Sequence, residues 1–356
     1  MTKTDFLVIG GGIAGISAAA ELSYHGSVRL LETEAHAAYH TSGRSAALYE
    51  PFYGPPPIVE LSLASGEGLA AREVLSPRGV LLVAGAGQED EFARESVDMR
   101  MTEITPDEAA EAFATLDPAK VQRVALGALA QDIDTDRLLQ GYLREAKSNG
   151  AQIEFSAPVT AIRRARGHFQ VETPKGAYSA STIINAAGAW ADQIAAMAGL
   201  KPLGIIPHRR SIARIAAPAG FDVSDWPMLL GVGESFYAKP DAGALIVSPA
   251  DAEPTTAHDA WADDMVLAEG IARYEAVSRY PVERMIANWA GLRSFARDGA
   301  PVYGRDPVEP AFIWFAGQGG YGFQSSVAAA KFIANVATGQ AVDAALARAI
   351  DPARFG

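Results

Sequence analysis

Three glycines and one acid near the start of the chain have the types and spacing needed to bind a dinucleotide. Gly10, Gly12 and Gly15 form a G-x-G-x-x-G pattern, and Glu32 follows 17 positions after the last glycine. The first glycine permits a tight turn, the second lets a pyrophosphate approach the backbone, and the third allows close packing of a helix on a strand. Glu32 can accept hydrogen bonds from a ribose diol, and an acid at this place disfavours the 2′-phosphate of NADP.

The surrounding sequence predicts the elements that would position these residues. An apolar run at 7–9 predicts a buried strand, Ile13 to about His25 an Ala-rich helix, and 28–31 a second strand. The helix N-terminus would offer unpaired N–H groups and a partial positive charge to the pyrophosphate. Because strand, turn, helix, second strand and acid follow in this order, a dinucleotide site explains the pattern better than an ordinary strand-to-helix turn. These residues leave the choice between NAD and FAD open.

Composition excludes several other classes of protein. The 356 residues suffice for two domains, or for one large α/β domain with an insertion. A net charge of −12 argues against a nucleic-acid partner. The absence of cysteine excludes disulfides, thiolate metal sites, cysteine catalysis and a flavin attached through cysteine sulfur. No apolar run reaches the roughly 18 residues of a membrane span, and the first strand starts too early for a signal peptide, so we expect a cytoplasmic protein.

Three further stretches could bring backbone close to a ligand. Small residues surround Arg44 in the run 39–47, where the arginine could meet a phosphate or a charge developing on a flavin; a surface loop is an equal alternative. An apolar strand at 183–184 ends at small residues and enters a helix. Near the opposite terminus, a predicted strand at 312–315 runs into the glycine-rich loop 316–324, and a helix follows.

Two other segments each allow a functional and a structural interpretation. Prolines stiffen residues 49–57 while Gly54 permits a bend, which is compatible with a lid over a pocket or with a rigid connector. The carboxylates within 132–136 suggest a metal site, but capping of the next helix explains them more simply. We therefore expect no metal.

Taken together, these stretches resemble the D-amino-acid oxidase superfamily, whose members hold FAD between both ends of the chain. Within it the chain is most similar to FAD-dependent D-amino-acid dehydrogenases of the D-arginine dehydrogenase type, and the resemblance covers essentially the whole sequence. The stretches that carry it are YHTSGRSAA (39–47), DIDTD (132–136), NAAGAW (185–190), ESFYAKPDAG (234–243), WAGLRSF (289–295) and QGGYGFQ (318–324).

The resemblance implies a two-domain α/β (α+β) fold. A Rossmann-like FAD-binding domain of the glutathione-reductase kind would be discontinuous, comprising residues 1–75, 132–204 and 288–356. A substrate-binding domain with an antiparallel sheet would comprise residues 76–131 and 205–287.

The resemblance also implies non-covalently bound FAD and a set of residues around it. The expected contacts are Gly10, Gly12, Ile13, Ala14, Gly15, Glu32, Thr33, Arg44, Ser45, Ala46, Ala47, Val159, Ala187, Gly188, Trp190, Gly291, Gly319, Gly320, Tyr321, Gly322, Phe323 and Gln324.

For the substrate, the resemblance implies that Arg210 and Arg293 clamp a carboxylate, with Tyr53 and Tyr237 near it. A guanidinium suits this task because its planar fork fixes a carboxylate in one orientation. Gly320 would offer its carbonyl to the substrate amine, and Gln324 would lie beside the flavin. From the residues alone, surface ion pairs would explain the arginines, although Arg293 lies in an otherwise apolar strand, and cross-strand packing would explain Tyr237 equally well.

Two departures concern the substrate side chain. The D-arginine-type relatives carry a histidine where this chain has Leu48, and an acid where it has Val80. An acid there would recognise a guanidinium or an ammonium group, and valine cannot. We therefore expect a neutral or apolar side chain, unless Glu50 supplies the missing negative charge from another direction.

The expected reaction is oxidative deamination of a D-amino acid to the imino acid, by hydride transfer to flavin N5, followed by hydrolysis to a 2-oxo acid and ammonia. A quinone, a dye or oxygen would accept the electrons. One alternative is oxidation of secondary or cyclic amino acids, such as N-methyl amino acids or proline analogues. A protein that binds FAD and a ligand without turnover is the other.

Overall fold

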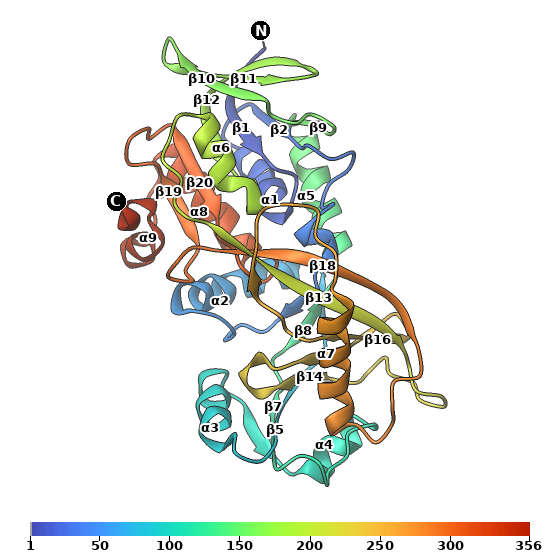
Figure 1. Ribbon diagram of the computed structural model, residues 1–356. Coiled ribbons are helices and arrows are strands. Elements are labelled where there is room, and N and C mark those ends of the chain that lie inside the picture. Colours follow the sequence, from blue (N-terminus) through green and yellow to red (C-terminus); the bar gives the residue numbers. More distant parts are fainter. Residues whose placement is uncertain (1) are drawn as a thin grey trace.

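The N-terminal strand lies at the centre of the first of two large sheets. The computed structural model describes residues 2–356 (Figure 1). The strand order is β10-β11-β12-β1-β2-β9, with β20 beside β12 and β19 beside β20; β1, β2, β9, β12 and β20 run parallel. The strands are β1 (Thr2–Ile9), β2 (Val28–Leu31), β9 (Gln152–Glu154), β10 (Ala161–Ala165), β11 (His168–Thr173), β12 (Gly176–Asn185), β19 (Val302–Arg305) and β20 (Phe312–Ala316).

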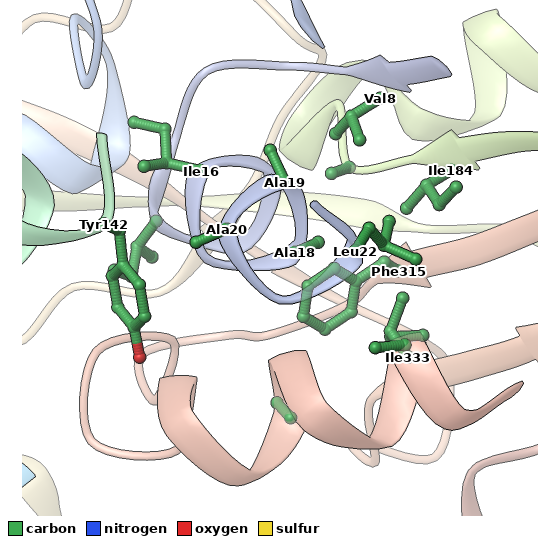
Figure 2. Close-up of a cluster of buried hydrophobic side chains, with 14 of the residues drawn as sticks. Val8, Ile16, Ala18, Ala19, Ala20, Leu22, Tyr142, Ile184, Phe315 and Ile333 are labelled. Atoms are coloured by element: carbon green, nitrogen blue, oxygen red, sulfur yellow. The ribbon is translucent and has the colours of Figure 1, made fainter. Parts of the chain in front are cut away.

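The apolar run in β1 is continuous because both faces of this sheet are covered. Val8 belongs to a core cluster with α1 (Ile13–Leu22), α5 (Thr135–Ser148) and α8 (Ser326–Thr338) (Figure 2). Leu7 and Ile9 point to the other face, where α6 (Ala191–Met197) packs. Side chains alternate along a strand, so a strand buried on both sides needs apolar residues at every position.

The second sheet is larger and mostly antiparallel, as expected, although its strands β14 and β5 pair in parallel. Its order is β17-β13-β16-β15-β14-β5-β7-β6, and β18 pairs with β13. The strands are β5 (Val80–Ala84), β6 (Thr102–Ile104), β7 (Arg123–Gly127), β13 (Ile206–Ala216), β14 (Met228–Gly231), β15 (Tyr237–Asp241), β16 (Ala244–Ser248), β17 (Glu253–Pro254) and β18 (Met285–Phe295). Three helices accompany it: α3 (Glu89–Asp98), α4 (Pro106–Ala112) and α7 (Asp264–Val277).

Strands β13 and β18 lie side by side between the two parts of the molecule (Figure 1). Their ladder runs from the pair Ile206 and Phe295 to the pair Ile215 and Met285. The domain boundary proposed from the sequence, at residue 288, falls within β18. The division into domains remains a proposal.

Short elements complete the chain around this centre. A small sheet has the order β3-β8-β4, and α2 packs against α8. The bounds are β3 (Leu48–Tyr49), β4 (Leu75–Pro77), β8 (Gln131–Ile133), α2 (Pro56–Ala71), α9 (Ala344–Ile350), and the 3-10 turns η1 (Thr41–Arg44), η2 (Gly188–Trp190), η3 (Val232–Glu234) and η4 (Pro352–Phe355). Over residues 2–356, no helix is both long and apolar enough to cross a bilayer.

Candidate active site

The glycine-rich turn after β1 has no room for side chains larger than glycine at two of its positions. Gly10 has a φ of +112°, and a Cβ on it would lie 2.4 Å from the carbonyl oxygen of Ala186. A Cβ on Gly15 would lie 1.9 Å from the Gly10 carbonyl oxygen, so α1 can pack this close only with glycine. Gly12 directly precedes α1. The turn therefore brings bare backbone and a helix N-terminus to the end of β1, as a pyrophosphate site requires.

Glu32, at the end of β2, is held against this turn. Its carboxylate accepts hydrogen bonds from the amides of Gly11 (2.5 Å) and Glu34 (2.8 Å). Each carboxylate oxygen has a second lone pair, which is free in principle to accept a hydrogen bond from a ribose hydroxyl. The residues present thus fit the adenosine end of FAD.

A cavity of about 400 Å³ begins at this turn and extends to the second sheet. The expected cofactor residues that line it are Gly10, Gly12, Ile13, Ala14, Glu32, Thr33, Arg44, Ser45, Ala46, Val159, Ala187, Gly188, Trp190, Gly291, Gly319, Gly320, Gly322 and Phe323. Of the others, Gly15 lies behind the turn, Ala47 and Gln324 line an adjoining compartment, and Tyr321 packs against Tyr53 with ring centroids 5.3 Å apart. Residues from both chain ends therefore surround one space.

Contacts with protein backbone explain Arg44 without a cofactor. Its guanidinium donates to the carbonyl oxygens of Ala260 (2.8 Å) and Ala290 (2.9 Å) and pairs with Asp259 (2.5 Å). The arginine thus joins the loop 39–47 to β18. The sequence could not show this, because all three partners lie more than 200 positions away.

Sequence reasoning missed several polar residues of the cavity wall, among them Ser42 and His40 in the same loop. The Ser42 hydroxyl accepts a hydrogen bond of 3.0 Å from the Ile13 amide at the start of α1. His40 packs on Trp190, with ring centroids 4.6 Å apart, and its Nε2 lies 3.0 Å from Glu34. Both residues belong to the stretch YHTSGRSAA, and their position in it was the available signal.

The two predicted clamp residues meet because β13 pairs with β18. Arg210 lies opposite Gly291, and Arg293 lies opposite His208. Arg210 and Arg293 therefore occupy alternate positions on one face of neighbouring strands. Both line the cavity together with Tyr237 of β15 and Gly320. A Cβ on Gly320 would lie 2.8 Å from the guanidinium carbon of Arg293, so glycine leaves room for this arginine.

A carboxylate that the sequence analysis did not single out lies between the two arginines. Glu234 Oε2 is 3.2 Å from Arg210 Nη2 and 3.8 Å from Arg293 Nη1. The Tyr53 hydroxyl donates to Glu234 Oε1 at 2.5 Å. Glu234 is the first residue of the stretch ESFYAKPDAG, but its helical turn η3 and its positive φ of 50° were not readable from sequence.

The charges of this cluster stabilise one another. Burial by itself would raise the pKa of Glu234, yet Arg210 and Arg293 hold it below its ordinary value, so the group is a carboxylate. Burial and the adjacent Glu234 raise the pKa of Tyr53, and its hydroxyl keeps its proton and donates. Despite burial, the neighbouring Tyr53, Tyr237 and Glu234 raise the pKa of Arg293.

A second compartment, of about 80 Å³, adjoins the clamp and is mostly apolar. Its lining includes the three residues that we expected near the substrate side chain, namely Leu48, Glu50 and Val80. It also includes Met99, Met228 and Leu230, which sequence reasoning missed because they come from distant elements. Arg210, Tyr237, Arg293 and Gly320 are common to both cavities, so the compartment opens at the clamp.

Glu50 is the acid of this compartment, with only 2% of its surface exposed. Its Oε1 accepts a hydrogen bond of 3.2 Å from the Phe52 amide, whereas its Oε2 has no hydrogen-bond partner among the described residues. Burial raises the pKa of Glu50 to about 7, and the Phe52 amide offsets only part of this effect.

The proline-containing segment is attached to the C-terminal glycine loop through one glutamine. Gln324 accepts a hydrogen bond from the Glu50 amide (3.3 Å) and donates one to the Tyr53 carbonyl (3.0 Å). Gln324 therefore fixes the segment that carries Glu50 and Tyr53, both of which line the second compartment.

Comparisons with known proteins agree with this geometry. The family model described as "DAO: FAD dependent oxidoreductase" matches residues 5–336. The chain is 26% identical over 335 residues to sarcosine oxidase subunit beta from Rhizobium meliloti, covering 87% of this chain and 78% of that one. It is 26% identical over 283 residues to mitochondrial dimethylglycine dehydrogenase from Homo sapiens, covering 73% of this chain but only 32% of that protein.

Solved structures show the same fold. Glycine oxidase from Geobacillus kaustophilus superposes with a TM-score of 0.85 at 21% identity, covering 100% of this chain and 98% of that one. L-proline dehydrogenase from P. horikoshii also gives a TM-score of 0.85 at 21% identity, covering 99% and 98%. The expected fold class and FAD as cofactor are thus confirmed. The D-arginine-type subgroup is not shown by these relatives.

We predict that Gly10→Ala loses at least about tenfold in FAD affinity, equivalent to about 1.4 kcal/mol. The added Cβ would collide with the Ala186 carbonyl oxygen, which lies 2.4 Å from its ideal position. FAD titration of the deflavinated protein by fluorescence quenching measures the change. Gly176→Ala is the matched control, because Gly176 also has a positive φ (+141°) but no described atom lies within 4 Å of its Cβ position. Equal affinities for both variants would contradict the prediction.

A second prediction follows from the raised pKa of Glu50. Between the ordinary value of 4.5 and about 7, the folded chain keeps a proton that the unfolded chain has lost. The stability contribution of this group is therefore present below pH 4.5 and is lost as the pH rises through about 7. The difference in unfolding free energy between Glu50→Gln and wild type should therefore shift in favour of the variant, by at most about 3 kcal/mol, when the pH is raised from 5 to 8.

Denaturant unfolding of the FAD-bound proteins at the two pH values measures this gain. The exposed Glu60 on α2 provides the control variant Glu60→Gln, for which no such pH-dependent gain is expected. If the unfolding free energies of Glu50→Gln and wild type differed by the same amount at pH 5 and pH 8, the raised pKa of Glu50 would be contradicted.

Proposed function

The chain belongs to the DAO family of FAD-dependent oxidoreductases, and from this premise we propose that it oxidises the Cα–N bond of an amino acid that carries a side chain. The observation that carries the proposal is the convergence of Arg210 and Arg293 on one carboxylate at the junction of the two cavities.

Glu234 supports the choice of a carboxylate ligand. Its carboxylate is held by two guanidinium groups and one tyrosine hydroxyl, which are the partners that an amino-acid carboxylate needs. A substrate carboxylate that takes this place must displace Glu234 from the arginines. Arg293 gains more from such a partner than Arg210 does, because its distance to Glu234 is longer, at 3.8 Å against 3.2 Å.

The chain's own residues would orient the amine. With the carboxylate held at Arg293, the carbonyl of Gly320 is the proposed acceptor for the substrate amine, and both residues face the larger cavity. Bound FAD supplies the two-electron oxidation, whereas the protein supplies position and electrostatics. Water then hydrolyses the imine, and a quinone, a dye or oxygen is the proposed electron acceptor.

Two classes of amine remain candidates. Sarcosine, dimethylglycine and proline, which are named in three of the relatives, favour N-alkylated or cyclic amino acids over the D-amino acids that we first expected. Glycine, named in a fourth, is a primary amino acid without a side chain. The compartment beside the clamp favours a substrate with a side chain, which sarcosine and glycine lack. Cyclic or N-alkylated amino acids with a side chain satisfy both observations, and primary D-amino acids satisfy the second.

We expect amino acids with a side chain to reduce the flavin with a kcat/KM at least about tenfold above that of glycine or sarcosine. Burial of even two methylene groups in the compartment accounts for such a factor, at about 0.8 kcal/mol each. Anaerobic bleaching of the flavin absorbance measures it, with both enantiomers of proline, N-methylated amino acids and common primary amino acids. Sarcosine or glycine as the best substrate would contradict the role of the compartment. No bleaching with any amino acid would favour a binding protein without turnover.

Replacing Arg293 by methionine should leave FAD bound but abolish nearly all substrate-dependent flavin reduction. Removing one partner of a buried charge-assisted contact costs on the order of 2–5 kcal/mol, which corresponds to about 30-fold or more. Stopped-flow reduction rates and flavin content are the measurements. Arg297→Met serves as control, because Arg297 is exposed and packs on Phe355 at the surface. Near-normal reduction by Arg293→Met would remove this residue from the site.

A further inference from the structure

Glu50 is a buried acid without a counter-charge. Its Oε2 is the one carboxylate oxygen, over the described part of the chain, that is buried and has no hydrogen-bond partner. No salt bridge within residues 2–356 includes this residue. Its Oε1 has one partner, the Phe52 amide. A charged group in apolar surroundings is costly unless it is paired, so the protein alone does not explain an acid here.

The nearby buried cations cannot serve Glu50 because they already have partners. Arg210 and Arg293 lie against Glu234. Asp132 of β8 accepts from both Arg78 (2.6 Å) and Lys239 (2.7 Å). Each of these acids has two cations, whereas Glu50 has none among the described residues. Only a proton or a cation brought by a ligand can therefore neutralise Glu50.

We propose that Glu50 selects the substrate by its side chain, which would end in a cation such as a guanidinium or an ammonium group. This inference rests on the proposed function, because the same compartment would hold the side chain of the amino acid oxidised at the clamp. Glu50 would then contact the end of the substrate that does not react, and it would determine specificity without taking part in the oxidation.

The lining of the compartment fits such a side chain along its length. Arginines meet the substrate carboxylate where the compartment opens. Leu48, Val80, Met99 and Met228 provide apolar walls for methylene groups, and Glu50 provides the one acid besides Glu234 in this lining. A lysine or arginine side chain has an aliphatic stem for the apolar walls and a charged end for the acid.

This inference revises the preference for neutral side chains that Val80 and Leu48 suggested. Both residues do line the compartment, but Glu50 lines it with them. Burial raises the pKa of Glu50 to about 7, and a cation beside the carboxylate would lower it. A side chain ending in a methyl group would leave the acid both desolvated and unpaired.

The decisive test compares arginine with citrulline, which has the same shape but a neutral urea in place of the guanidinium. For the reactive enantiomer at pH 8, wild type should reduce its flavin with a kcat/KM for arginine at least tenfold above that for citrulline. In Glu50→Gln this ratio should fall to about one. In the control Glu60→Gln the ratio should stay as in wild type.

Binding without turnover separates this inference from the proposed function. 5-Guanidinopentanoate has the carboxylate and the cation but no α-amine to oxidise, and hexanoate has the same carboxylate with an uncharged alkyl end. Perturbation of the flavin spectrum should show at least tenfold tighter binding of the guanidino acid by wild type, and no such preference in Glu50→Gln. A preference for the guanidinium compound that persists in Glu50→Gln would overturn the role of Glu50. The absence of this preference in wild type, for either pair of compounds, would overturn it as well. Tight binding of the guanidino acid without reduction by any amino acid would overturn the proposed function alone.

Discussion

The ladder between β13 and β18 is the interaction on which the site depends. It joins two segments about 80 positions apart and fixes Arg210 opposite Gly291 and Arg293 opposite His208. A slip by one residue would turn Arg293 to the other face of the sheet. The loop 39–47 also attaches to this ladder, because Thr41 donates to the Leu292 carbonyl at 2.7 Å and the Trp289 indole donates to the Arg44 carbonyl at 3.2 Å. One pair of strands therefore positions both the clamp and a wall of the FAD cavity.

The charges at the junction of the two sheets are arranged so that each buried cation meets an acid. Asp132 from β8 meets Arg78 and Lys239, and Glu234 from η3 meets both clamp arginines. Removing water from a charge is costly, and pairing recovers part of that cost only when the partner is close. Glu234 thus satisfies both arginines in the free protein, and a substrate carboxylate at the proposed clamp would replace one carboxylate by another.

The glycine-rich part of the site was largely predictable from sequence, and the part that we propose binds the substrate was not. Gly10, Gly12, Gly15 and Glu32 lie within one strand–helix–strand unit, so their spacing determines their geometry locally. The two arginines were found through a family resemblance, because no local pattern predicts that β13 and β18 pair. Glu234, Met99 and Met228 went unnoticed since only the tertiary arrangement brings them to the clamp. Arg44 has backbone carbonyl partners in distant segments, which sequence composition cannot reveal.

The clamp arginines and Glu50 carry opposite charges, and these charges limit how a charged substrate can lie in the proposed site. The clamp presents two cations, while the lining of the second compartment also contains the acid Glu50. An amino acid with a cationic side chain can bind in one direction only, since the reversed pose would bring its carboxylate to Glu50 and its cation to the arginines. The orientation that remains directs the Cα–N bond toward the larger cavity, where Gly320 and the cofactor residues lie. The cost of keeping Glu50 unpaired in the free protein is then the condition for this selectivity, because a leucine at the same place would stabilise the fold but would offer no partner to a cationic side chain.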